Sequence, residues 1–134
     1  MNDRRAIPVT VSGMNGYVIQ RIREPMTMKR IVVESPYASH PNGRHAGAAY
    51  ALECMRDCLA RGEAPIASHL LYTIVLDDTS EEQRRLGIDA GFAWQAVADV
   101  VALYIDYRET ESMTKAAMIA ESLGIRIERR KIGV

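Results

Sequence analysis

The pattern of hydrophobic and polar residues divides the chain near residue 28. Two short β-like segments, 7–11 and 17–22, precede this point, and the stretch between them contains Asn15-Gly16. An Asn-Gly pair between two such segments is typical of a tight hairpin turn. We therefore expect an N-terminal β-hairpin or arm in residues 1–28, followed by a main domain in residues 29–134.

From residue 30 onward, short apolar runs alternate with longer stretches of helical periodicity. The predicted strands cover 31–33, 64–68, 99–105 and 125–128, and the predicted helices cover 44–61, a stretch that starts at Thr79, and 112–123. We interpret residues 69–78 as a loop with a short helix. Strands that alternate with helices imply parallel pairing and right-handed crossovers. The predicted fold class is therefore α/β, an open, doubly wound, flavodoxin- or Rossmann-like sheet of four to five mostly parallel strands.

The helical periodicity also predicts which residues face the core. The apolar stripe predicted for the first helix is Ala48, Leu52, Met55 and Leu59, with Ala51, Cys54 and Cys58 beside it. The stripe predicted for the next helix is Leu86, Ala90, Ala93 and Val97. Thr79 and Glu82 have the spacing of a capping box, which predicts that this second helix starts after Thr79.

Composition and charge exclude several classes of protein. The 134 residues include 17 Lys and Arg against 17 Asp and Glu, which argues against binding of a nucleic-acid polymer along a basic face. No apolar run approaches the roughly 20 residues of a membrane helix, and the first residues lack the apolar core of a signal peptide. The two cysteines have no second ligand pair for a metal. We expect a cytoplasmic protein without membrane contact, metal or cofactor.

Ligands of an open α/β sheet bind at the carboxyl ends of the strands. Polar residues follow the first three predicted strands: Glu34, Ser35, Tyr37, His40 and Arg44, then Ser68, His69, Asp77 and Asp78, then Asp106, Tyr107, Arg108, Glu109, Glu111 and Ser112. The acidic members Asp77, Asp78, Glu109 and Glu111 predict an acidic pocket rim that suits a sugar better than a polyanion.

Each of these groups has two interpretations. Tyr37 is either part of a turn or a flat surface on which a base stacks. Asp77 and Asp78 either form a solvated loop or supply a carboxylate to ribose hydroxyls or to proton transfer. His69 is either a hydrogen-bonded structural residue or a site residue, and Arg44 lies at a helix start that is either simply capped or binds an anion.

Three runs of sequence resemble the nucleoside 2-deoxyribosyltransferase-like superfamily. Residues 31–37 (IVVESPY) are similar to its first strand and loop, 99–104 (DVVALY) to a later strand, and 112–125 to its final helix and strand entry. Residues 64–78 are similar to a small branch found often in bacteriophages and prophages. The resemblance covers the chain from residue 30 to residue 130 and implies the α/β fold described above.

The resemblance implies an enzyme that cleaves the N-glycosidic bond of a nucleoside or nucleoside monophosphate. In the superfamily a glutamate attacks the sugar C1′, but the matched position in this chain holds Ala116, which has no nucleophile. We expect Glu111, just before the helix, to be the substitute. Tyr37 would position the ligand, and Asp77 or Asp78 would serve in acid–base work or ribose contact.

Three hypotheses therefore stand beside each other. The first is a deoxyribosyltransferase or nucleotide N-glycosidase. The second is a non-catalytic nucleotide-binding module in which Ser35, Arg44, Ser112 and Met113 line a phosphate and sugar site, and His69 is a further ligand-binding candidate. The third is an interaction protein whose N-terminal arm mediates assembly.

The resemblance also implies a homo-oligomer, a dimer or larger, in which a neighbour completes each pocket. Trp94, Tyr104, Tyr107 and the N-terminal hairpin are the candidates for such contacts.

Overall fold

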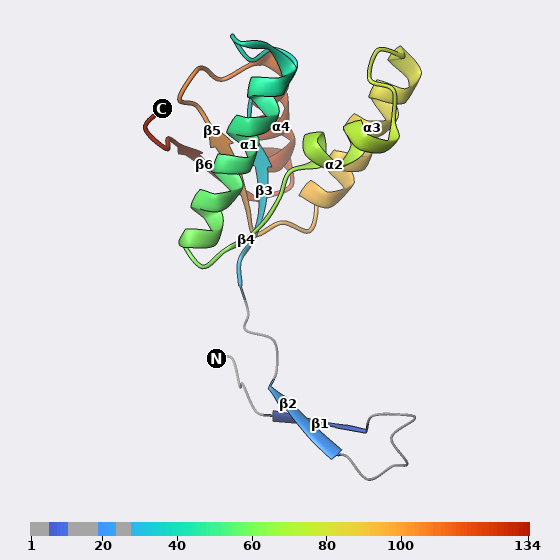
Figure 1. Ribbon diagram of the computed structural model, residues 1–134, viewed down its shortest axis with the longest axis vertical. Helices are drawn as coiled ribbons and strands as arrows, with labels where there is room; N and C mark the ends of the chain where they lie inside the picture. The colour runs from blue at the N-terminus through green and yellow to red at the C-terminus, as the bar shows by residue number, and fades with distance from the viewer. Residues whose placement is uncertain (1–5, 11–18, 24–27) are drawn as a thin grey trace.

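The computed structural model describes residues 6–10, 19–23 and 28–134, and its main part is a four-stranded parallel sheet with helices on both faces (Figure 1). The strands of this sheet are β3 (Arg30–Glu34), β4 (Ala64–Ile66), β5 (Val100–Tyr104) and β6 (Arg126–Arg130). The helices are α1 (Gly43–Ala60), α2 (Ser68–Val75), α3 (Glu81–Gln95) and α4 (Glu111–Ser122). The predicted open, doubly wound α/β fold is confirmed, and α2 is the short helix predicted within 69–78.

The predicted N-terminal hairpin is also present. Strand β1 (Ala6–Thr10) pairs antiparallel with β2 (Ile19–Arg23), from Ala6 opposite Arg23 to Thr10 opposite Ile19. The predicted turn at Asn15-Gly16 lies outside the described residues.

The order of the strands creates a switch point in the middle of the sheet. The order is β4-β3-β5-β6, and each neighbouring pair is parallel. From β3 the chain runs through α1 to one side, returns across β3 to β5, and continues through α4 to the other side. The connections therefore leave β3 and β5 in opposite directions, and in such sheets the crevice between the two carboxyl ends is where ligands bind.

Both faces of the central strands are covered. Ile31 and Val33 are fully buried in the core cluster that includes residues of α1, whereas Val32 is packed with Val101 and with Ala120 of α4. Successive side chains of a strand point to opposite faces, so a strand covered on both sides needs an apolar residue at every position. This requirement explains the continuous β-branched run in β3.

The buried face of α1 differs from the predicted stripe. Leu52 and Leu59 are 48% and 57% exposed, whereas the smaller Gly47, Ala51 and Cys54 are buried. These small residues allow the helix to lie close to the sheet and to the loop that follows β3, and the larger Tyr50 is buried beside them in the core. Both cysteines are buried, as predicted, and Cys58 Sγ lies 3.2 Å from the Tyr104 hydroxyl.

The predicted stripe of α3 is also wrong. Leu86 and Val97 are 59% and 50% exposed, and the buried Gly91 instead lies against Ser68 of α2. The N-cap of this helix is Ser80 and not Thr79, and the Ser80 side chain accepts a hydrogen bond from the Gln83 backbone N–H. Within the described ranges, none of the helices has the length and apolar character needed to cross a membrane.

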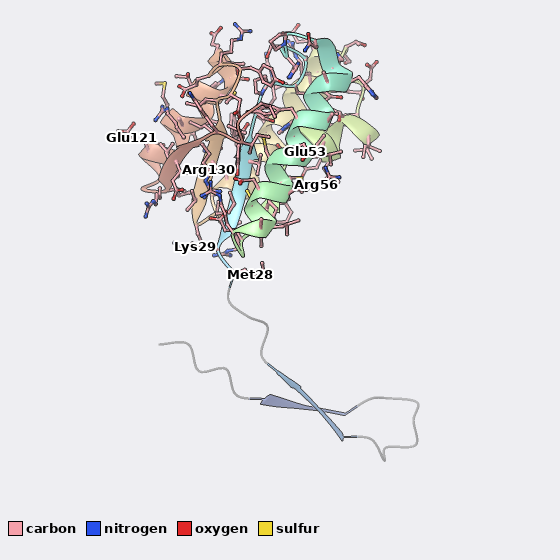
Figure 2. All side chains as sticks on the ribbon, turned by 60° about the vertical axis from the view of Figure 1, so that its left-hand side comes forward. Met28, Lys29, Glu53, Arg56, Glu121 and Arg130 are labelled. Atoms are coloured by element: carbon pink, nitrogen blue, oxygen red, sulfur yellow. The ribbon has the colours of Figure 1, made fainter. Side chains whose placement is uncertain are left out.

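A buried arginine ties the last strand to the connection between α1 and β4. Arg130 of β6 (Figure 2) donates two hydrogen bonds to the Glu63 carboxylate, at 2.7 and 2.8 Å. It also donates to Glu128 at 3.0 Å and to the Tyr104 hydroxyl at 3.3 Å. A bidentate pair of this kind fixes geometry, and removal of one partner would leave an uncompensated buried charge.

Gly47 allows α1 to approach the loop that follows β3 and contains Tyr37. A Cβ atom at this position would lie 2.8 Å from the Cα of Tyr37, closer than real Cβ atoms come to backbone. We expect Gly47→Ala to destabilise the fold by about 1–3 kcal/mol, measured by chemical denaturation. Gly87→Ala is the matched control, because its Cβ would meet only side-chain atoms of Leu76 and Tyr72. Equal stability of Gly47→Ala and wild type would contradict this packing.

Candidate functional site

A cavity of about 940 Å³ lies at the carboxyl ends of β3, β4 and β5, where the switch point is. Its lining comes from the loop after β3, from α2 and α3, and from residues around the start of α4. Six of the nine site residues named from the sequence line it: Ser35, Tyr37, His69, Asp78, Glu111 and Ser112. Residues from separate segments of the chain thus surround one cavity of a size that suits a small ligand.

Glu34, the last residue of β3, also lines the cavity. Its side chain is partly buried and makes no hydrogen bond or ion pair with any other residue that the structure describes. Burial raises the pKa of Glu34 to about 7, because a charged carboxylate loses its hydration there. Sequence reasoning noted Glu34 at a strand end without selecting it as a site residue. The sequence feature that could have identified it is an acidic residue directly at the end of a strand that is buried on both faces.

Ser35 and His69 are joined by a hydrogen bond within the cavity wall. Ser35 Oγ lies 2.9 Å from His69 Nε2, which brings the loop after β3 against the first turn of α2. Burial lowers the pKa of His69 to about 4, so its ring is neutral near neutral pH. A neutral imidazole has one donor and one acceptor nitrogen, so this wall carries hydrogen-bonding capacity without charge.

Tyr37 and Asp78 line one edge of the cavity, and Arg44 contacts both of them from outside the lining. The centroid of the Tyr37 ring lies 6.0 Å from that of His69, with the two planes tilted by 57°. The guanidinium carbon of Arg44 lies 5.9 Å from the Tyr37 centroid, and the same side chain forms an ion pair with Asp78. Arg44 therefore holds two lining residues in place without itself lining the cavity, and it neutralises the Asp78 carboxylate.

Two residues named from the sequence have other positions. Asp77 Oδ1 accepts hydrogen bonds from the Thr79 hydroxyl at 2.6 Å and from its N–H at 3.0 Å, and these bonds lower the pKa of Asp77. Met113 is buried against Leu103 in the core. Neither residue lines the cavity, because Asp77 closes the turn before α3 and Met113 anchors the first turn of α4.

The cavity is mixed in charge, not acidic as predicted from the sequence. Its lining includes four cationic side chains: Arg84, Arg85, Arg108 and Lys115. Glu109, which the prediction placed on the rim, instead pairs with Arg129 at 2.6 Å. Arg84 and Arg85 of α3 were not predicted to line the cavity, because the sequence prediction assigned the wrong face of that helix to the core.

Ala116 is buried where α4 contacts α3. Its backbone oxygen accepts a hydrogen bond from Gln95 Nε2 at 2.5 Å. The residues of α4 that line the cavity are Glu111, Ser112 and Lys115, all near its N-terminus. The position at which the resemblance places a nucleophile thus carries only a methyl group.

Residues 29–130 match the protein family described as a domain of unknown function (DUF7768). The matched range contains the whole parallel sheet and every residue that lines the cavity. A search of the curated proteins gave no match. The comparisons therefore identify the family and assign it no function.

The pKa of Glu34 gives a prediction for stability against pH. The folded protein retains this proton up to a pKa of about 7, whereas an ordinary glutamate loses it near 4.5, so ionisation of Glu34 destabilises the fold as pH rises through that window. Below this pH window Glu34 is protonated in both the folded and the unfolded chain, so it does not destabilise the fold. We expect Glu34→Gln to raise the free energy of unfolding by about 2–3 kcal/mol near pH 8 and to have little effect near pH 4. An equal effect at both pH values would contradict the assignment.

His69 has the opposite sign. Its pKa is lowered from 6.5 to about 4, so the unfolded chain binds the proton first and stability falls as pH drops from 6.5 to 4. Because Glu34 acts in the opposite sense over this window, the informative quantity is the difference in free energy of unfolding between wild type and His69→Gln, which we expect to shift against wild type as pH falls from 6.5 to 4 in denaturation curves. A difference that does not change with pH would show that His69 is not held neutral.

Proposed function

The chain belongs to the DUF7768 family, and we propose that its cavity binds a nucleoside or nucleotide and cleaves the bond between base and sugar. The single observation that carries this proposal is the combination of groups in the lining: an aromatic side with the rings of Tyr37, His69 and Phe92, and a polar side in the segment after β5 with hydroxyl and charged groups. A nucleotide has the same two parts, a flat base and a polar sugar that carries hydroxyl or phosphate groups. The resemblance to the nucleoside 2-deoxyribosyltransferase-like superfamily supports the same ligand class.

The aromatic side suits a base. Tyr37, His69 and Phe92 line the cavity, and the rings of Tyr37 and His69 are close and tilted relative to each other. Stacking of a base on an aromatic ring is largely independent of the base, because every base has a π face. The Ser35–His69 pair adds hydrogen-bonding groups that could distinguish one base edge from another.

The polar side suits a sugar and a phosphate. Thr110 is the N-cap of the 12-residue helix α4, and Ser112 lies in its first turn. A helix N-terminus favours anions, and the cationic Arg108 and Lys115 line the same part of the cavity. The carboxylate of Glu111 is exposed at this helix start, where it can accept hydrogen bonds from sugar hydroxyls.

The second candidate is a nucleotide-binding module without catalysis. Ala116 favours it, because the position matched to the superfamily nucleophile has no reactive group. The two candidates share the same bound ligand and differ only in the appearance of free base.

A panel of nucleosides, nucleoside 5′-monophosphates and free bases tests the proposal. We expect one nucleoside or nucleotide class to raise the Tm and to release free base, detected by chromatography. Tyr37→Ala should weaken binding by about tenfold, because stacking contributes about 1–3 kcal/mol. Tyr37→Phe keeps the ring and should bind as wild type does.

The outcomes separate the candidates. Binding without free base, even with protein in excess over nucleotide, would favour the non-catalytic module. A Tm that no member of the panel changes would contradict both candidates, as would equal affinity of Tyr37→Ala and wild type.

We also propose that the chain forms a homo-oligomer through α2 and α3. Ile74 and Val75, at the end of α2, are 79% and 73% exposed, and Trp94 of α3 is 48% exposed. Such apolar exposure is typical of a contact surface. Of the aromatic residues named from the sequence, Tyr107 is exposed, but Tyr104 is fully buried in the core and is not available for such a contact.

Light scattering tests this assembly. We expect the mass of a dimer or larger species for wild type, and the mass of a monomer for Ile74→Lys, because the charge would be desolvated in the contact. A monomeric wild type would contradict the proposal.

A further inference from the structure

We propose that Glu34 is the catalytic carboxyl of this site, that it gives its proton to the leaving base, and that water rather than a protein carboxylate takes the sugar. The inference rests on the proposed function and adds to it both a catalytic residue and a class of reaction, hydrolysis instead of transfer. The geometry of the sheet carries it.

The position of Glu34 follows from the strand order. Since β3 lies between β4 and β5, Glu34 at its end lies between the residues that follow those two strands. The aromatic group at His69 follows β4, and the polar group at Arg108 and Ser112 follows β5. A nucleotide that places its base on the first group and its sugar on the second has its N-glycosidic bond above the end of β3. Glu34 is the carboxyl at that end.

The other acids near the cavity are less suited to the reaction. Asp78 is held in an ion pair with Arg44, and Glu81 pairs with Arg85 at 3.6 Å. Glu111 at the start of α4 and Asp89 of α3, which also lines the cavity, are both exposed, so water stabilises their charges.

Glu34 itself is free to act on a ligand. Among the described residues it has no hydrogen-bond or ion-pair partner, so no neighbour competes for its proton. Its raised pKa, a consequence of burial, means that a proton remains available near neutral pH.

The reaction balances with water as the co-reactant. The Glu34 carboxyl transfers its proton to the base as the bond between C1′ and the base nitrogen breaks, and the bonding electron pair leaves with the base. The oxygen of a water molecule bonds to C1′, and a proton of that water returns to the Glu34 carboxylate. The products are the free base and a sugar with a 1′-hydroxyl. No sugar is held on the protein, since Ala116 offers no nucleophile.

Two measurements on the full-length protein test the inference, with the nucleotide that binds best in the panel as the probe. We expect Glu34→Gln to slow base release at least 100-fold while its Kd for the nucleotide stays within about threefold of wild type. Glu121→Gln is the matched control, because Glu121 is exposed near the far end of α4 (Figure 2) and does not line the cavity. Addition of an isotopically labelled free base should give no labelled nucleotide. Because glutamine has nearly the same shape as a protonated glutamate and carries no charge, the variant is expected to fold, which a thermal melt checks.

Each contrary result has a separate meaning. Nucleotide binding without base release by wild type would overturn the role of Glu34 and leave the binding function intact. Base release that survives in Glu34→Gln, or that is lost instead in Glu111→Gln, would also overturn it. Incorporation of labelled base would show a transferase with a sugar-bearing group on the protein. Failure to bind any nucleotide would overturn the proposed function and this inference together.

Discussion

The enclosure of β3 is the constraint on which the rest of the structure depends. This strand is hydrogen-bonded to β4 on one edge and to β5 on the other, and helices cover both of its faces. Each of its central residues must therefore be apolar, and polar chemistry can begin only where the strand ends. Glu34 occupies that end, next to water but with much of its hydration removed, which is why its carboxyl differs from an ordinary surface glutamate.

The fold was largely predictable because its main signals are local. The β-branched run in β3 and the alternation of strands with helices identify the parallel sheet without long-range information. The faces of the helices were not predictable in the same way. Leu52 and Leu86 were expected to face the core, yet both are exposed, while Gly47 and Gly91 are buried. Close approach of backbones selects small residues, and a pattern that weighs only bulk misses this selection.

The site was predictable in its location and less so in its members. The rule for open α/β sheets placed it at the carboxyl ends of the strands, and residues such as Tyr37 and His69 do meet there. The position of Asp77 outside the cavity was not predictable from sequence, because the hydrogen bonds it accepts from Thr79 depend on the conformation of a turn. The role proposed for Glu34 required its burial and its lack of a partner, and both are properties of the folded chain.

The central claim, that the site is built around a protonated carboxyl at the end of β3, has a direct test. Carboxyl ¹³C NMR of glutamate-labelled protein, with Glu34→Gln to assign the resonance, would follow this group through a pH titration with and without a nucleoside 5′-monophosphate. The account predicts a midpoint near 7 for Glu34 in the free protein and a displaced resonance when the nucleotide is bound. A midpoint near 4.5, the ordinary value for a glutamate, and a resonance that the nucleotide does not move would contradict it.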